Sequence, residues 1–307
     1  MQLVTFEHQG KMKLGVKFGE FLIDLGAAAK TFAHSMTEQE ITAYAAIVAG
    51  DMVGLLQVQE EGIAFVQKLV DAVRTAQLPP LNEILLAQPT VHLKAPLLRP
   101  GKIICVGKNY IDHATEMNSE PPTIPILFAK FANVINDPGA PFTKPLQSYQ
   151  VDYEAELAVI IGKTAKFVKR EDAFTYIAGY SCFNDLSIRD FQRRTSQWLQ
   201  GKTFDGSGPL GPSLVTRDEI TDPQNLTIRC FVNEEIRQQA NTAEMIFDIP
   251  FLLEYISSIM TLEPGDVIAT GTPSGVAAGM QEPRYLRAGD EVIVEIERLG
   301  QLRTEIV

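Results

Sequence analysis

Apolar and polar positions alternate in short runs near the start of the chain and then take up a helical spacing. Alternation predicts strands over Gln2–Glu7, Leu14–Phe18 and Phe21–Asp24, and apolar residues three and four apart predict helices within 37–76. Prolines at positions 79, 80, 89, 96 and 100 then interrupt both patterns between residues 77 and 102. We therefore expect a small α+β N-terminal domain over residues 1–97, ending in a proline-rich connection, and a second domain over residues 98–307.

Strand-like runs dominate this second domain. Short stretches rich in β-branched and aromatic residues predict strands at 103–106, 126–131, 157–161, 226–232, 266–270 and 291–297. Helical spacing is found around 110–117, 171–178, 186–198 and 249–260. The pattern predicts an α+β fold of twisted, mixed but largely antiparallel sheets with few helices.

Two acidic residues stand at the mouth of the most apolar of these runs. Glu154 and Glu156 flank Ala155 just before the run 157–161. Side chains alternate faces along a strand, so both carboxylates point the same way, roughly 6.6 Å apart along the backbone. They repel each other unless a cation lies between them. A solvated strand face in an acidic protein is the alternative.

A further acidic position follows the apolar segment that ends at Phe183. Asn184 or Asp185 could cap a helix that starts there. Asp185, Arg189 and Gln192 would then share one face of this helix, because they are spaced i, i+4 and i+7. A surface helix with one ion pair is the alternative.

The three acids together suggest a metal site. Glu154, Glu156 and Asp185 offer only carboxylate oxygens, which suit Mg²⁺ or Mn²⁺ and argue against structural zinc. Three carboxylates also leave coordination positions for substrate or water.

Several motifs follow one another in the second domain: Ile104-Cys105-Val106-Gly107-Lys108-Asn109-Tyr110 with His113 and Glu116, Asp152-Tyr153-Glu154-Ala155-Glu156-Leu157, Asn184-Asp185, Gly201-Lys202, and Thr270-Gly271-Thr272-Pro273-Ser274-Gly275-Val276. In this order they resemble the fumarylacetoacetate hydrolase family over about residues 100–307. The resemblance implies a compact β-roll for the C-terminal domain and a homodimer.

The resemblance also implies roles for individual residues. These are metal ligation by Glu154, Glu156 and Asp185, an active-site lysine at Lys202, binding of the substrate's keto-acid end by Arg189, Gln192 and Thr272, and a catalytic pair of His113 and Glu116 on a mobile lid. Two positions depart from the family's pattern, since Phe131 follows Lys130 in place of a proline and Val232-Asn233-Glu234 replaces a Val-Asn-Gly turn. Lys130 is a further candidate for substrate binding, because its charge lies on an apolar strand and must meet a partner.

The spacing of His113 and Glu116 indicates acid–base chemistry. At i, i+3 on a short helix, Glu116 can hydrogen-bond one imidazole nitrogen and leave the other to accept a proton from water. A metal that chelates a 2-oxo acid stabilises the enolate left when a bond to C3 breaks. We therefore expect a hydrolase that cleaves a carbon–carbon bond of a 2,4-dioxo acid, an acylpyruvate such as fumarylpyruvate or acetylpyruvate. An oxaloacetate decarboxylase, a 2-hydroxymuconate-type isomerase and a non-enzymatic metal-binding assembly module are the alternatives.

Composition restricts the partners and the compartment. The formal net charge of −11 lacks the positive charge that nucleic-acid binding requires. Cys105, Cys182 and Cys230 are odd in number and lie in apolar segments, which predicts buried reduced thiols. The chain starts without a signal-type segment, and no run approaches the ~18 apolar residues that span a bilayer. We expect a cytoplasmic enzyme for a small 2-oxo acid, without nucleic-acid or membrane partners.

Overall fold

The computed structural model describes residues 1–76 and 81–307. The expected strands and helices of the first part are confirmed, while Pro79 and Pro80 of the expected connection lie outside the described residues. The elements of this part are β1 (Gln2–His8), β2 (Lys11–Phe18), β3 (Phe21–Asp24), α1 (Leu25–Phe32), α2 (Glu38–Ala49), α3 (Met52–Gln57), α4 (Gln59–Thr75), α5 (Leu81–Ile84), β4 (Leu85–Ala87) and β5 (His92–Lys94).

Local capping explains where the first helices begin. Asp24 accepts a hydrogen bond from the backbone of Ala27 and so starts α1, a helix that the apolar pattern did not predict. Thr37 and Glu40 form a capping box at the start of α2, and Gly50 ends that helix in the left-handed region.

Strands make up most of the second part, as the sequence predicted. Its elements are β6 (Ile103–Gly107), α6 (Ile111–Glu116), β7 (Ile126–Lys130), β8 (Ile135–Asn136), β9 (Val151–Asp152), β10 (Ala155–Ile161), β11 (Ile177–Asn184), β12 (Ser187–Ile188), α7 (Arg189–Gln192), α8 (Leu199–Lys202), β13 (Gly208–Thr216), β14 (Thr227–Val232), β15 (Glu235–Asn241), α9 (Ile249–Ile259), β16 (Val267–Ala269), β17 (Glu291–Ile296) and β18 (Gly300–Glu305).

Within the described residues, one large sheet joins both parts of the chain. Its main path runs β4-β3-β2-β1-β13-β11-β10-β16-β6-β7, and β1 pairs antiparallel with β13, with Leu3 opposite Leu214. A second sheet has the order β15-β14-β17-β18. Between the strands of the described part of the chain, pairing is antiparallel except between β16 and β6 and between β13 and β8. The expected fold class, α+β with mixed and largely antiparallel sheets, is confirmed.

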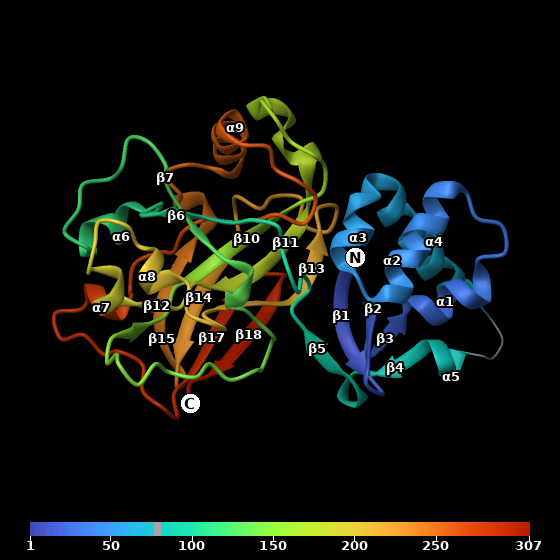
Figure 1. Cartoon of the computed structure of the whole chain (residues 1–307), viewed down its shortest axis with the longest axis horizontal. Coiled ribbons are helices and arrows are strands. Elements are labelled where there is room, and N and C mark those ends of the chain that lie inside the picture. Colours follow the sequence, from blue (N-terminus) through green and yellow to red (C-terminus); the bar gives the residue numbers. More distant parts are fainter. Residues whose placement is uncertain (77–80) are drawn as a thin grey trace.

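Apolar packing also crosses the expected domain boundary near residue 98. One core cluster joins residues of the N-terminal helices, such as Phe65 and Leu69, with Cys105 and Ala158 from the large sheet. Another cluster fills the second part around β10, β14 and α9. In Figure 1, β1 to β3 lie beside the strands of the C-terminal part, and the N-terminal helices pack next to β1 to β3. The division into two domains stays a prediction.

The prediction of one helix over 186–198 was wrong about where the helix starts and how long it is. Residues 177–184 continue as β11, which pairs with β10 on one side and β13 on the other, so neither Asn184 nor Asp185 caps a helix. Ser187 and Ile188 then form β12 against β9, and α7 begins only at Arg189. Most of the segment expected as a helix over 171–178 is a 3₁₀ helix, Arg170–Tyr176. Strand pairing here overrides the local helical pattern.

The three cysteines are buried and free, as expected. Among the described helices, none has both the length and the apolar character needed to cross a membrane.

Candidate active site

Three carboxylates converge where β10 and β11 lie side by side. Glu154 directly precedes β10, Glu156 is its second residue, and Asp185 directly follows β11. Ala155 pairs with Asn184, and the backbone N–H of Asp185 donates to the carbonyl oxygen of Glu154 at 2.9 Å. One carboxylate oxygen from each acid lies within 4.8 Å of the other two, and all three side chains are buried. The acids therefore come together as the sequence predicted.

The charges of this triad are unequally compensated. Burial would raise the pKa of Glu154, but the cations of Lys202 and Arg189 outweigh it and lower that pKa to about 2. Burial and the charges of Asp185 and Glu154 raise the pKa of Glu156 well above its usual value. A divalent cation among the three oxygens would remove this repulsion, so the donor set fits Mg²⁺ or Mn²⁺.

Lys202 lies against two of the three acids. It ends the short helix α8, and its Nζ is 2.6 Å from Glu154 Oε2 and 2.7 Å from Asp185 Oδ2. Burial would lower the pKa of Lys202, but Asp185 and Glu154 raise it above its ordinary value. The side chain therefore remains a cation and can neutralise developing negative charge without giving up its proton.

Lys130 does not line the cavity of the site. Its Nζ is 2.6 Å from Asp185 Oδ1 and donates to the carbonyl oxygens of Ser207 at 2.8 Å and Leu186 at 3.3 Å, which uses all three ammonium protons. The structure therefore does not support our expectation that Lys130 binds substrate. Lys130 contacts Asp185 on the side facing away from the cavity.

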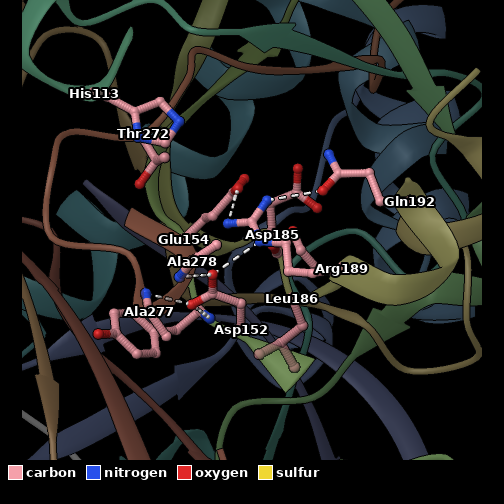
Figure 2. A network of polar contacts seen from close by, with 12 residues as sticks. His113, Asp152, Glu154, Asp185, Leu186, Arg189, Gln192, Thr272, Ala277 and Ala278 are labelled. Atoms are coloured by element: carbon pink, nitrogen blue, oxygen red, sulfur yellow. Dashed lines mark hydrogen bonds and ion pairs between the residues drawn. The ribbon is translucent and has the colours of Figure 1, made fainter. Parts of the chain in front are cut away.

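Arg189 is held on three sides in a buried position. Its Nε donates to Asp152 Oδ2 at 2.8 Å, its Nη1 donates to Gln192 Oε1 at 3.0 Å, and its Nη2 is 2.7 Å from Glu154 Oε1. Figure 2 shows this network, with Gln192 and Arg189 on the side of the site opposite His113. Arg189 and Gln192 share α7 as expected, although Asp185 is not part of that helix.

His113 and Glu116 form a hydrogen-bonded pair on α6. His113 Nδ1 and Glu116 Oε1 are 2.7 Å apart, so Nδ1 donates to the carboxylate. No hydrogen bond to Nε2 is found within residues 1–76 and 81–307, so this nitrogen can accept a proton. Glu116 Oε2 also accepts a hydrogen bond from the backbone of Gly275 at 2.8 Å. The pair therefore links α6 to the loop that carries Thr272.

That loop approaches both the acids and the second sheet. The backbone N–H of Gly271 donates to Glu156 Oε2 at 2.9 Å, with Gly271 at a φ of 100° that favours glycine. A Cβ at Gly275 would lie 1.9 Å from the carbonyl oxygen of Arg237, so only glycine lets the loop pack on β15 there. Thr272 lies between these two glycines and is buried.

A cavity of about 270 Å³ opens over the site. Of the residues that the sequence singled out, it is lined by His113, Glu154, Glu156, Arg189, Gln192, Lys202 and Thr272. Figure 2 shows His113 and Thr272 together on one side of this arrangement. Further cations at Lys108 and Arg193, with the ring of Trp198, also line the cavity. The cavity could therefore accommodate one molecule that carries two anionic groups.

Two buried residues of the site had no role in the sequence analysis. Asp152 accepts hydrogen bonds from the backbone of Ala277 at 2.8 Å and of Ala278 at 3.0 Å in addition to that from Arg189. Gln238, on β15, contacts the loop at Thr272. In the sequence, the only sign that Asp152 belongs to the site was its position at the start of the motif Asp152–Leu157. No motif or spacing pointed to Gln238.

Comparison with known proteins supports an enzymatic role for this cavity. The family model described as "Fumarylacetoacetate (FAA) hydrolase C-terminal" matches residues 102–307. A Bos taurus protein named oxaloacetate tautomerase, mitochondrial, is 42% identical over 313 residues, covering 100% of this chain and 92% of that protein. A Xenopus laevis protein of the same name is 47% identical over 228 residues, covering 74% of this chain and 72% of that protein. These relatives are named as mitochondrial, and a cytoplasmic location for this chain stays a prediction.

Solved structures with the same fold include several enzymes. A fumarylacetoacetate hydrolase from Exiguobacterium antarcticum has a TM-score of 0.79 at 34% identity and covers 100% of this chain and 99% of its own. A maleylpyruvate hydrolase from Sphingobium sp. SYK-6, in complex with manganese (II) ion and pyruvate, has a TM-score of 0.75 at 28% identity with the same coverage.

Proposed function

Because the chain belongs to the fumarylacetoacetate hydrolase family, we propose that it is a metal-dependent enzyme that interconverts the keto and enol forms of oxaloacetate. The name of its relatives supports this choice over the hydrolysis that the sequence alone favoured. The charge of the cavity also supports it, since Lys108, Arg189 and Arg193 could attract both carboxylates of a dicarboxylic 2-oxo acid.

Glu154, Glu156 and Asp185 would hold a divalent cation, Mg²⁺ or Mn²⁺. When bound, such a cation polarises the oxygens of a 2-oxo acid and stabilises negative charge on an enolate. Arg189 and Gln192 would orient the keto-acid end from one side, and Thr272 would bind it from the other. Lys202, which stays protonated, would add a fixed positive charge beside the enolate oxygen.

The single observation that carries the proposal is the pair of His113 and Glu116 at the edge of the cavity. Since Nδ1 donates to Glu116, the free Nε2 can accept the proton at C3 of the keto acid. The electrons of the broken C–H bond then form the C2–C3 double bond, and the protonated His113 returns the proton to the C2 oxygen, directly or through water, to complete the enol. The reverse transfer restores the keto form. No nucleophile is consumed, and the imidazole of His113 ends the reaction in its starting form.

Hydrolysis of an acylpyruvate is the second candidate. The neighbour named maleylpyruvate hydrolase favours it, because its structure contains manganese and pyruvate. The same Nε2 of His113 could take a proton from water in place of C3, and water would then attack the C4 carbonyl.

A side-by-side assay tests both candidates. The protein is stripped with a chelator, and each activity is measured before and after addition of Mg²⁺ or Mn²⁺. Tautomerisation is followed by the absorbance of enol oxaloacetate, and hydrolysis by release of pyruvate from acetylpyruvate, fumarylpyruvate and maleylpyruvate. We expect metal-dependent tautomerisation well above that of the same metal without protein. Tautomerisation at the background rate, with rapid pyruvate release, would replace the first candidate by the second.

Assembly can be tested in the same preparation. We propose a homodimer on the basis of the family resemblance alone, and light scattering of the eluted protein gives its mass directly. A mass close to that of one 33.9 kDa chain would contradict it.

A further inference from the structure

The side-chain amide of Gln238 joins two segments of the candidate site. Its Oε1 accepts a hydrogen bond at 2.9 Å from the backbone N–H of Ala155, the residue between the two glutamates of the triad. Its Nε2 donates to Thr272 Oγ1 at 2.8 Å and to the carbonyl oxygen of Pro273 at 2.7 Å. One amide thus connects the backbone of the acidic pair with the loop on the other side of the cavity.

The neighbours of this amide determine which way it faces. The backbone N–H of Ala155 can only donate, and the carbonyl oxygen of Pro273 can only accept. An amide turned over would oppose two donors at Ala155 and two acceptors at Pro273. Nε2 must therefore face Thr272, whose hydroxyl oxygen is the acceptor in this contact.

A threonine hydroxyl carries one proton, which it can donate once. Because Thr272 Oγ1 already accepts from Gln238, its own proton has to point elsewhere. No hydrogen bond donated by this hydroxyl is found among the described residues, and Thr272 lines the cavity. We propose that Gln238 is a positioning residue that directs the Thr272 hydroxyl proton at the carboxylate of a bound 2-oxo acid. The inference rests on the proposed function in that it takes such an acid as the ligand.

The backbone around Gln238 holds it in place. The register of β14 and β15 shifts between Cys230 and Phe231, which leaves Arg237 as an extra residue next to Gln238. Such a bulge redirects the neighbouring side chains. Gln238 is 1% exposed, and Gly275 packs closely on the same backbone. The amide therefore has little freedom to turn away from Thr272.

Replacement of Gln238 by glutamate tests the proposal. In Gln238→Glu, one carboxylate oxygen can still accept from Ala155, but the other cannot donate, so the Thr272 hydroxyl turns its proton toward the new acid. Gln239→Glu is the matched control, because it makes the same chemical change one residue further along β15 at an exposed position. Oxalate, a planar dianion that resembles a 2-oxo acid, serves as the ligand at saturating Mg²⁺, with its Kd measured by calorimetry.

We expect Gln238→Glu to weaken oxalate binding roughly tenfold to a hundredfold, as for loss of a hydrogen bond to a charged group, and Gln239→Glu to leave it unchanged. The added negative charge alone would also weaken binding, so the change is repeated in Thr272→Val and Thr272→Ser backgrounds. Loss of the effect in the valine background and its retention in the serine background would support orientation of the hydroxyl. An effect of equal size in all three backgrounds would overturn it.

Thermal unfolding separates orientation from damage to the fold. If Gln238→Glu unfolds at too low a temperature to be measured, Gln238→Met is used in the same three backgrounds with the same criteria, since it removes the donor without adding charge. Turnover of oxaloacetate is recorded for the parent in parallel. If the parent turns over oxaloacetate no faster than the metal alone, but the effect on oxalate binding depends on the residue at position 272, only the proposed reaction is contradicted. If turnover is metal-dependent, but the effect on oxalate binding is equal with threonine, valine and serine at position 272, only the role of Gln238 is contradicted. A parent that does not bind oxalate would contradict both.

Discussion

Asp152 and Arg189 form a buried ion pair in which Arg189 Nε donates to Asp152 Oδ2 at 2.8 Å. Both side chains are almost fully removed from solvent. The same carboxylate accepts hydrogen bonds from the backbone of Tyr153, Ala277 and Ala278. Four donors thus converge on one acid, which fixes the guanidinium beside Glu154 and the turn after the Thr272 loop at the same time.

Asp152→Asn should therefore damage both stability and substrate binding. An asparagine has a single acceptor oxygen, and its NH₂ group would face at least one of the donors that now meet the carboxylate. We expect a loss of about 3 kcal/mol in the free energy of unfolding, as for a broken buried ion pair, and a raised KM for oxaloacetate. Urea unfolding and steady-state kinetics measure the two effects. Asp190→Asn is the control. Asp190 lies next to Arg189 in α7, is partly exposed, and accepts a hydrogen bond from Ser148 instead of from Arg189.

Sequence reasoning located the acids of the site because strand alternation and short motifs are local properties. Glu154 and Glu156 needed only the two-residue period of a strand. Asp152 and Gln238 could not be assigned in this way, because their partners are remote: Ala277 is 125 residues from Asp152, and Ala155 is 83 residues from Gln238. Contacts of this kind depend on sheet packing, which no local pattern specifies.

The same limit explains the error after Phe183. Helical spacing of polar residues there is real, but Ile177–Asn184 has partners on both edges, in β10 and β13. Those backbone hydrogen bonds stabilise a strand that the local sequence pattern did not predict. Asp185 therefore reaches the site from the end of a strand, and not from the helix that carries Arg189.

Neutralising the two glutamates of the triad should have opposite effects on the metal-free protein. Glu154 is paired with Lys202 and Arg189, so Glu154→Gln removes one of the two carboxylates that each of these buried cations contacts and should cost about 3 kcal/mol of stability. Glu156 makes no ion pair among the described residues and is repelled by Asp185 and Glu154. Glu156→Gln should therefore unfold at the parent temperature or above it.

Both of these variants should lose affinity for Mg²⁺, because each removes one anionic ligand. Thermal unfolding with and without a chelator separates the two effects. Glu156→Gln with a lowered unfolding temperature in the chelator would contradict the repulsion, and full stabilisation by Mg²⁺ in either variant would remove that residue from the ligand set.

The two buried lysines around Asp185 should also behave differently. Lys202 lines the cavity, whereas Lys130 contacts Asp185 from the opposite side and donates to two carbonyl oxygens. We expect Lys202→Met to lower kcat roughly a hundredfold at saturating Mg²⁺, since it removes a fixed charge beside the enolate. Lys130→Met should instead lower stability by about 3 kcal/mol and raise the Mg²⁺ concentration needed for activity, with little change in the KM for oxaloacetate once the metal saturates. A large rise in that KM would return Lys130 to the substrate-binding residues.

The last prediction concerns the acid–base pair. His113 Nε2 is the proposed acceptor of the C3 proton, so His113→Ala should lower kcat for tautomerisation of oxaloacetate by something on the order of a hundredfold or more. Glu116→Gln should lower it less, because an amide oxygen can still accept from Nδ1 but no longer stabilises the protonated imidazole. Oxalate binding at saturating Mg²⁺ is the control measurement, and it should be unchanged in His113→Ala, since the imidazole holds no carboxylate in the proposed mechanism.

Any hydrolysis of acylpyruvates should fall in the same variants, because both candidate functions would need the same nitrogen of His113. If His113→Ala lowers oxalate affinity and turnover by equal factors, the pair mainly closes α6 over the cavity through the contact of Glu116 with Gly275. Tautomerisation at the parent rate in His113→Ala would mean that another group takes the C3 proton. Lys202, which is already protonated in the site, could not be that group, and the mechanism proposed for His113 would be wrong.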